Sequence, residues 1–155
     1  MKRVLFVCTG NICSSPTAEG VARGMARRLG LAESLQFDSA GTHSYHVGEP
    51  PDPRSQRAAK ARGYDLSAQR ARRVTEFDFA HFDLVLAMGG DHLAWLERAC
   101  PPPHRHKLRL FLDFSKAGGS EVPDPYYGGM EGFDEVLDLV EDAVDGLLKE
   151  LAPAK

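Results

Sequence analysis

The chain has 155 residues, of which 43% are hydrophobic and 26% charged, and its net charge is -3. A chain of this length can bury the core of one domain, and this composition excludes a disordered, collagen-like or low-complexity protein. The slightly negative charge excludes a domain that binds nucleic acid by charge alone, and no apolar run approaches the roughly 20 residues of a membrane span.

The first thirty residues predict a strand, a tight loop and a helix. Residues 2–8 are apolar and rich in β-forming side chains, which is typical of a buried strand. A Thr-Gly-Asn loop follows. Ser15 then resembles a helix N-cap with Pro16 in the first helical position, and apolar residues recur at helical spacing until Gly30.

Strands and helices alternate along the rest of the chain. Further strands are predicted at residues 35–39, 83–88 and 107–112. Helices are predicted at residues 54–62, from a cap at Asp91 to about Cys100, and from Phe133 to about Leu151, whereas residues 42–53 predict an irregular loop. We therefore expect a single domain over residues 1–155, with an α/β fold in which a four-stranded parallel sheet carries helices on both faces (a Rossmann-like three-layer sandwich).

The three cysteines are Cys8, Cys13 and Cys100. An odd, small number of cysteines, with no signal-peptide pattern at the N-terminus, predicts reduced thiols and a cytoplasmic location. Cys100 precedes three prolines and is interpreted as filler at a helix end. Cys8 lies where the first strand ends, which is the edge at which parallel sheets of this type bind ligands.

Cys8 is separated from the predicted helix by a short loop that contains Gly10. Such a loop can turn backbone N–H groups toward one point above the sulfur, and with the helix N-terminus these groups form a binding site for anions. The same field stabilises a thiolate, so the pattern predicts a phosphate cradle with a nucleophile in line. It is not a nucleotide-binding P-loop, because no Gly-Lys-Ser/Thr follows. The alternative is a buried cysteine at a strand end with no chemical role.

Asp124 begins a second candidate motif, Asp-Pro-Tyr-Tyr. A leaving alkoxide or phenoxide needs a proton, and a partly buried aspartic acid on a loop can supply it. The two tyrosines would then form apolar walls for a planar substrate. The alternative is an Asp-Pro turn with surface tyrosines.

These residues resemble a known family. The segment Cys8-Thr9-Gly10-Asn11-Ile12-Cys13, followed by Ser15-Pro16-Thr17-Ala18-Glu19, is similar to the phosphate loop of the low-molecular-weight protein tyrosine phosphatases. Three more segments resemble motifs of that family, in its order and at its spacing: Asp38-Ser39-Ala40-Gly41-Thr42, Asp52-Pro53-Arg54 and Asp124-Pro125-Tyr126-Tyr127. The resemblance covers essentially the whole chain.

The resemblance implies a role for each matching residue. Cys8 would form a cysteinyl-phosphate, and Asp124 would act first as the general acid and then as the base that activates water. Further roles would fall to the loop and its surroundings: phosphate binding by Thr9, Gly10, Asn11, Ile12, Cys13, Ser14 and Ser15; loop support by Asn11, Ser39 and Ser15; a disulfide trap for oxidised Cys8 at Cys13; a substrate crevice at Tyr45, Tyr126 and Tyr127. No metal or cofactor is implied. The implied partners are a phosphotyrosine protein or small aryl phosphate and a phosphate or sulfate ion in the loop, without nucleic acid or membrane, and the chain would be a monomer or weak dimer.

The chain departs from the family at one position that matters for catalysis. The family loop reads cysteine, five residues, arginine and serine, and this chain has Ser14 where that arginine belongs. The guanidinium would hold two phosphoryl oxygens, so its loss predicts turnover lowered at least about a thousandfold. A serine here is consistent with a natural binding protein or feeble enzyme and with a substitution made to disable catalysis. A smaller departure is Gly89, where the family often has an acid.

Three alternatives follow from this departure. The chain could be a catalytically inactive, phosphoanion-binding regulatory protein. Arg54 could replace the missing loop arginine. A thiol-based arsenate reductase, which shares the fold, is less favoured because residues 82–92 contain no second cysteine pair.

Charge is distributed unevenly along the chain. Residues 54–73 contain seven basic side chains and one acid, whereas residues 121–150 contain ten acids and one base. This pattern indicates either two solvated faces or a basic stretch that attracts an anionic partner.

Overall fold

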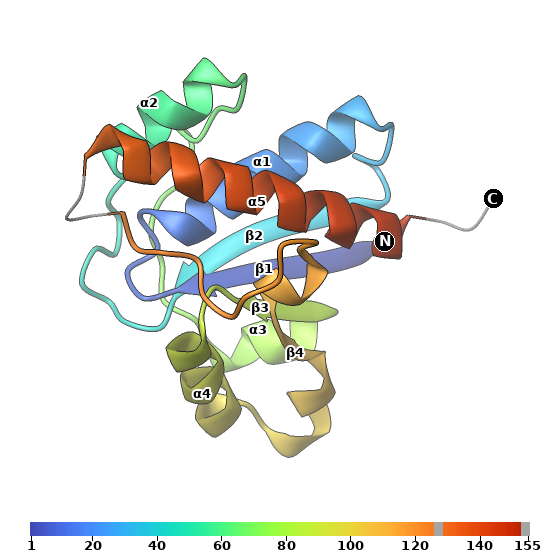
Figure 1. Ribbon diagram of the computed structural model, residues 1–155. Helices are drawn as coiled ribbons and strands as arrows, with labels where there is room; N and C mark the ends of the chain where they lie inside the picture. Colours follow the sequence, from blue (N-terminus) through green and yellow to red (C-terminus); the bar gives the residue numbers. More distant parts are fainter. Residues whose placement is uncertain (126–128, 153–155) are drawn as a thin grey trace.

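A four-stranded parallel sheet runs through the computed structural model, which describes residues 1–125 and 129–152 (Figure 1). The strands are β1 (Lys2–Cys8), β2 (Leu35–Gly41), β3 (Leu84–Ala87) and β4 (Leu108–Leu110), in the spatial order β2-β1-β3-β4. The predicted parallel sheet is therefore confirmed. The last strand is shorter than expected because the 3₁₀ turns η1 (Pro102–Lys107) and η2 (Phe111–Phe114) enclose it.

Helices cover both faces of the sheet, as predicted (Figure 1). On one face lie α1 (Ser14–Arg28), α5 (Met130–Leu151) and, beside them, α2 (Pro53–Ala61). On the other face lie α3 (Glu76–His81) and α4 (Gly90–Ala99). Helix α3 was not predicted, since six residues are too few to show a helical period. It begins where the Asp78 carboxylate accepts a hydrogen bond from the Thr75 backbone N–H at 2.8 Å.

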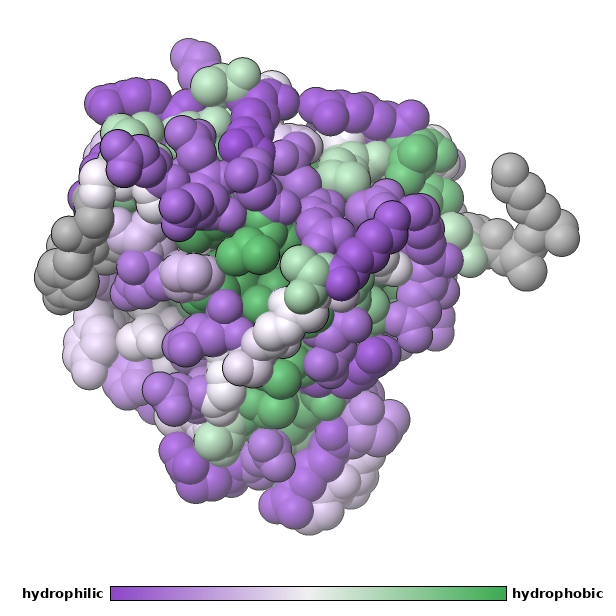
Figure 2. All heavy atoms as spheres, in the orientation of Figure 1, coloured by the Kyte–Doolittle hydropathy of each residue, from purple (hydrophilic) through white to green (hydrophobic). Residues whose placement is uncertain are grey.

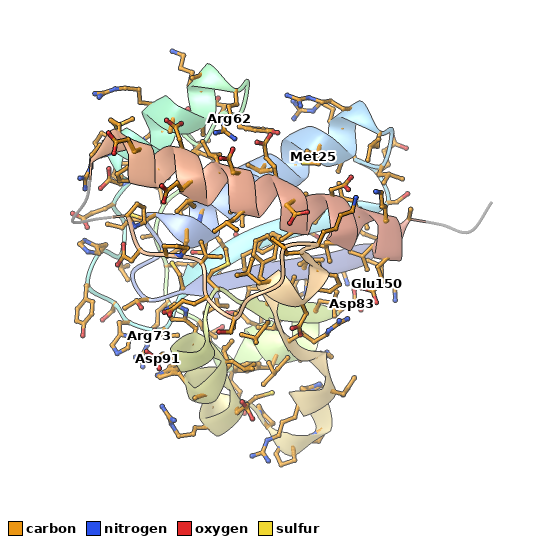
Figure 3. All side chains as sticks on the ribbon, in the orientation of Figure 1. Met25, Arg62, Arg73, Asp83, Asp91 and Glu150 are labelled. Atoms are coloured by element: carbon orange, nitrogen blue, oxygen red, sulfur yellow. The ribbon has the colours of Figure 1, made fainter. Side chains whose placement is uncertain are left out.

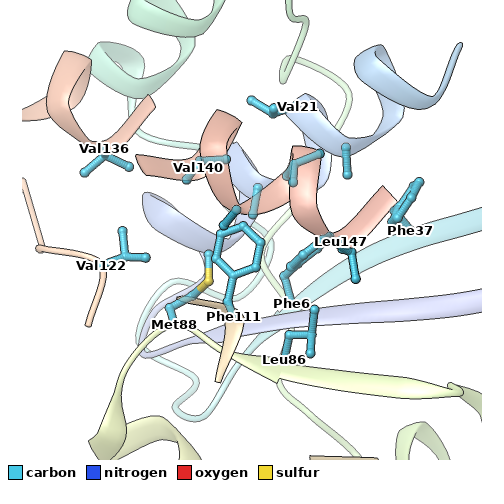
Figure 4. Packing of buried hydrophobic residues seen from close by; sticks show 14 of the residues in the cluster. Phe6, Val21, Phe37, Leu86, Met88, Phe111, Val122, Val136, Val140 and Leu147 are labelled. Atoms are coloured by element: carbon cyan, nitrogen blue, oxygen red, sulfur yellow. The ribbon is translucent and has the colours of Figure 1, made fainter. Parts of the chain in front are cut away.

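The alternation of side chains in β1 builds two cores. Val4 and Phe6 belong to the cluster beneath α1 and α5, whereas Leu5 and Val7 belong to the cluster beneath α3 and α4. Phe6 meets Phe111 edge to face, with ring centroids 5.4 Å apart, and Figure 4 shows both rings between the sheet and α5. Burial on both faces holds β1, and with it Cys8, in a fixed position.

Two predicted helix caps are wrong. Helix α1 begins at Ser14, so Ser15 lies inside the first turn, and Cys13 occupies the cap position without a side-chain hydrogen bond. Helix α4 begins at Gly90 after Gly89, so Asp91 lies in its first turn, where a negative charge still favours the helix (Figure 3). Both caps lie two residues before the predicted ones, and the first difference changes the role of the Ser15 hydroxyl.

The basic and acidic stretches of the chain meet in space. Arg62, just after α2, donates hydrogen bonds to Asp138 and Glu141 of α5 at 2.9 and 2.5 Å (Figure 3). Some of the basic and acidic side chains of these two stretches therefore form ion pairs between the end of α2 and α5. The face in Figure 2 is mainly hydrophilic, with apolar side chains gathered in a band across its middle. Among the described helices, none combines the length and the apolar character of a membrane span.

Candidate active site

Cys8 ends the central strand at the carboxyl edge of the sheet. Its side chain is buried, and its backbone carbonyl accepts a hydrogen bond from the Thr42 N–H at 2.9 Å. The next strand in the sequence, β2, pairs with one side of β1 and β3 pairs with the other, so the order of strands reverses at β1, which is the position at which sheets of this type bind ligands.

The Cys8 sulfur receives hydrogen bonds from two groups of the loop and helix. The Asn11 backbone N–H donates to Sγ at 3.3 Å, and the Ser15 Oγ lies 2.9 Å from Sγ. The Asn11 side-chain amide donates to that same Ser15 oxygen at 2.9 Å, so the serine hydrogen is available for the sulfur. These two contacts fix the position of the sulfur. Ser15 is thus occupied with the cysteine, which explains why it does not cap the helix.

Asn11 is the centre of the loop's internal support. It adopts a left-handed backbone conformation with φ of 59°, which asparagine tolerates better than most residues. Its amide also donates to Ser39 Oγ at 2.9 Å, and its carbonyl oxygen accepts from the Arg72 backbone N–H at 3.0 Å. All polar groups of this buried side chain therefore have partners, which holds the turn in one shape.

A buried carboxylate supports the same network from below. Ser39 donates its hydroxyl hydrogen to Glu19 at 2.7 Å, and Arg23 forms an ion pair with Glu19 one helical turn along α1. Burial raises the pKa of Glu19 above its ordinary value, against the opposing effects of Ser39 and Arg23. Sequence reasoning assigned no function to Glu19 or Arg72. Glu19 gave a signal, because a charged residue stands among the apolar positions of a helix.

The end of β2 passes very close to the loop. A Cβ atom at Gly41 would lie 2.6 Å from the Thr9 carbonyl oxygen and 3.1 Å from that of His43. Only glycine allows this approach of two backbones, so Gly41 belongs to the framework of the site.

A cavity of about 430 Å³ opens above Cys8. Its walls bring together eight predicted site residues: Cys8, Thr9, Gly10, Ile12, Cys13 and Ser14 from the loop and the start of α1, and Tyr45 and Asp124 from distant parts of the sequence. The remaining lining residues are His46, Asp91, His92, Glu121 and Val122. The predicted site residues Asn11, Ser15 and Ser39 are not part of this lining.

The described walls of the cavity contain three carboxylates and neither lysine nor arginine. Ser14 lies on the wall, with 7% of its surface exposed. Arg54, the suggested replacement for the loop arginine, is not among the described lining residues: it pairs with Asp52 at 3.0 Å and lies over the Phe133 ring. Within the described lining, the groups that can give positive potential are therefore the backbone N–H groups, the amino-terminal end of α1 and the imidazoles of His46 and His92.

Asp124 and Tyr45 are exposed residues on the cavity wall. The Val122 N–H donates to the Met88 carbonyl at 2.8 Å and thereby fixes the loop that carries Asp124 beside the cavity. Asp124 is exposed, whereas the sequence suggested partial burial. Tyr45 is 72% exposed and stacks on His43. Tyr126 and Tyr127 lie outside the described residues.

The three cysteines are buried free thiols. Burial, with the charges of Asp52, Asp124 and Cys8, raises the pKa of Cys13 to about 12. Cys13 is therefore a protonated, weakly nucleophilic thiol at neutral pH. Cys100 packs in the apolar cluster beneath α3 and α4. In the described parts of the chain, no three His, Cys, Asp or Glu side chains are arranged to hold a metal ion.

Comparisons with known proteins agree with this architecture. A family model described as low molecular weight phosphotyrosine protein phosphatase matches residues 3–155. A low molecular weight protein-tyrosine-phosphatase of Streptomyces coelicolor is 45% identical over 150 residues, which cover 94% of this chain and 91% of that protein. The human low molecular weight phosphotyrosine protein phosphatase is 39% identical over 137 residues, covering 87% and 86% of the two chains. A crystal structure of a protein tyrosine phosphatase from Entamoeba histolytica, with Hepes in the active site, matches with a TM-score of 0.94 at 41% identity and covers 97% of both chains.

Proposed function

Because the chain belongs to the low molecular weight phosphotyrosine protein phosphatase family, we propose that it hydrolyses aryl phosphate monoesters through Cys8, at a rate strongly limited by Ser14. The observation that carries the proposal is the Cys8 sulfur at the base of the cavity, with Ser15 and the Asn11 N–H directed at it. The substrate class is a phosphotyrosine protein or a small aryl phosphate. Three buried free thiols support a reducing compartment such as the cytoplasm.

The reaction needs two displacements at phosphorus. In the first, the Cys8 thiolate forms a sulfur–phosphorus bond while the bond to the phenolic oxygen breaks, and Asp124 gives its proton to that oxygen. In the second, the Asp124 carboxylate takes a proton from water, the water oxygen bonds to phosphorus, and the thiolate leaves as phosphate is released. The loop amides and the end of α1 stabilise the negative charge in both steps.

Ser14 limits both displacements. A serine offers one neutral donor, whereas an arginine offers a charged fork matched to two phosphoryl oxygens. The described cavity wall has no lysine or arginine to take its place. We therefore expect turnover at least about a thousandfold below that of the Ser14→Arg chain.

The absence of lysine and arginine from the described cavity wall also favours a second candidate function. A cradle without its cation can still hold an oxyanion while turnover falls below any useful rate, so the chain could act as a phosphoanion-binding regulator. The two functions differ in whether a covalent intermediate forms.

A trapping experiment tests the proposal. The chain is incubated with phenyl phosphate and quenched in acid, and the peptide containing Cys8 is examined by mass spectrometry for phosphocysteine. We expect a phosphorylated Cys8 peptide, and none in the Cys8→Ser chain. If the unsubstituted chain binds phosphate but never forms the phosphocysteine, the binding function replaces the enzymatic one.

A further inference from the structure

The cavity has the wrong charge for a dianion. Asp91, Glu121 and Asp124 stand on its wall, and the described lining contains neither lysine nor arginine. The groups of that lining able to become positively charged are the imidazoles of His46 and His92. A phosphoryl group that enters would therefore gain most from a proton on one of these two rings.

His46 is a poor source of that charge. Its Nδ1 lies 2.5 Å from a carboxylate oxygen of Glu49, so a proton on His46 would be neutralised by its own neighbour. Its ring also approaches the loop closely, because its Cδ2 lies 2.9 Å from where a Cβ of Gly10 would stand.

His92 is placed differently. It lies in the first turns of α4, and its Nε2 is 2.8 Å from Oγ1 of Thr9, a residue of the cradle itself. Its Nδ1 is buried, and within the described part of the chain this nitrogen has no hydrogen-bond partner. His92 therefore touches the cradle on one side and has an unused nitrogen on the other.

The charges that face His92 come from several elements. Burial lowers the pKa of His92, and His43 acts in the same direction. Asp91 of α4, together with Glu121 and Asp124 of the loop before α5, acts to raise that pKa. Burial prevails over these charges, so the ring is mainly neutral at pH 7. A dianion would add negative charge beside a ring that three carboxylates already favour in its charged form.

We propose that His92 takes up a proton when a phosphoryl or similar dianion enters the cavity, and that its imidazolium serves as the positive charge missing at position 14. This inference rests on the proposed seat of the phosphoryl group above Cys8. His92 would thus be a specificity-determining residue of the cradle, selecting doubly charged over singly charged anions.

The hydrogen bond between His92 and Thr9 connects the charged ring to the bound anion. Both nitrogens of a protonated imidazole are donors, so Thr9 Oγ1 must accept from Nε2. The hydroxyl hydrogen of Thr9 is then available to be donated into the cavity. A neutral ring whose Nε2 accepts would take that same hydrogen away from the anion.

The coupling between anion binding and proton binding fixes the direction in which anion affinity changes with pH. An anion that raises the pKa of His92 binds together with a proton, so its affinity is highest at low pH and falls as pH rises through the pKa of the complex. One coupled proton gives at most about a tenfold loss of affinity per pH unit.

Sulfate is a suitable probe, because it remains a dianion over the range of about pH 5 to 8 in which histidines titrate. All measurements use the Cys8→Ser background, which removes the thiol from the cavity. Calorimetry in buffers of different ionisation enthalpy gives both the affinity and the number of protons taken up. We expect affinity to fall severalfold per pH unit with proton uptake, and we expect His92→Gln to remove both effects. His46→Gln is the matched control and should keep them.

Imidazole NMR signals provide a second reading that needs no substitution at His92. Sulfate should raise the pKa of His92, and Ser14→Arg should reduce this response because the arginine supplies the charge. The inference is overturned if His92→Gln keeps the pH dependence, if sulfate leaves the His92 titration unchanged, or if sulfate binds only after Ser14→Arg. The last result would overturn the role of His92 without contradicting the proposed phosphatase function. That function is tested separately by phosphocysteine trapping with Cys8 intact.

Discussion

Placing an arginine at position 14 tests directly how this site works. Ser14 lies in the first turn of α1 on the wall of a cavity of about 430 Å³, so a longer side chain at this position has space to enter it. The described wall contains three carboxylates and neither lysine nor arginine, so the new cation would both bind the phosphoryl oxygens and offset the repulsion from those acids.

The expected gain follows from the chemistry of arginine. Arginines that serve phosphoryl transfer contribute about 10³–10⁵ in rate, which corresponds to about 4–7 kcal/mol of transition-state stabilisation. We therefore expect Ser14→Arg to raise kcat/KM for p-nitrophenyl phosphate by at least about a thousandfold. Ser14→Lys is the matched control: it adds the same charge without the two-pronged geometry and should gain much less.

Two results would refute this reasoning. If Ser14→Arg gained nothing while binding sulfate normally, the loop would not place a side chain of position 14 against the phosphoryl group. If the unsubstituted chain already hydrolysed p-nitrophenyl phosphate at the rate of Ser14→Arg, another cation would have to serve. Cys8→Ser, combined with Ser14→Arg, sets the background rate in both cases.

The remaining predictions concern the thiols, the buried acid and the general acid. Iodoacetamide at neutral pH should modify Cys8 well before Cys13, whose pKa is raised to about 12, and peptide mass mapping that found the reverse order would contradict this. Because burial raises the pKa of Glu19, the folded chain binds a proton at this carboxyl group more tightly than the unfolded chain does. The protonated Glu19 therefore stabilises the folded chain below about pH 4.5, and this stabilisation is lost as pH rises through the pKa of Glu19 in the folded chain. Glu19→Gln should remove that loss, and urea unfolding at about pH 4.5 and 7 that showed the same pH trend in both chains would argue against it. In the Ser14→Arg chain, Asp124→Asn should lower kcat by about 10²–10⁴ for phenyl phosphate and by less for p-nitrophenyl phosphate, whose leaving group needs no proton; equal losses would remove Asp124 from the role of acid.

Local patterns were sufficient to predict most of the fold. The apolar run at residues 2–8 and the strand–helix alternation predicted the parallel sheet and its two covered faces, and both are confirmed. The prediction failed where an element is too short to show a period, as in α3, and where 3₁₀ turns shorten β4. It also misplaced the start of α1, because a serine followed by proline looks like a cap whatever its hydroxyl binds.

The candidate site likewise has one part that could be predicted from local sequence and another that could not. Cys8, its loop and the start of α1 are contiguous, so spacing alone indicated an anion cradle next to a thiol. The support of that loop comes from residues far along the chain: Ser39 and the Arg72 backbone hold Asn11 across 28 and 61 positions. Spacing carries no information about such contacts, since they depend on how β2 and the loop before α3 pass beneath the cradle.

The sequence by itself determined the fold class and the nucleophile candidate, because residue type and local order set both of them, and its resemblance to a known family marked position 14 as the place where an expected arginine is replaced by serine. Only the tertiary structure decided what surrounds that position. It brought Asp91, His92, Glu121 and Asp124 from two separate segments onto one cavity wall, and it placed His92 against Thr9 across 83 positions. Electrostatic interactions act through space, so the net charge of -3 gave no indication of how the charges gather around the cavity.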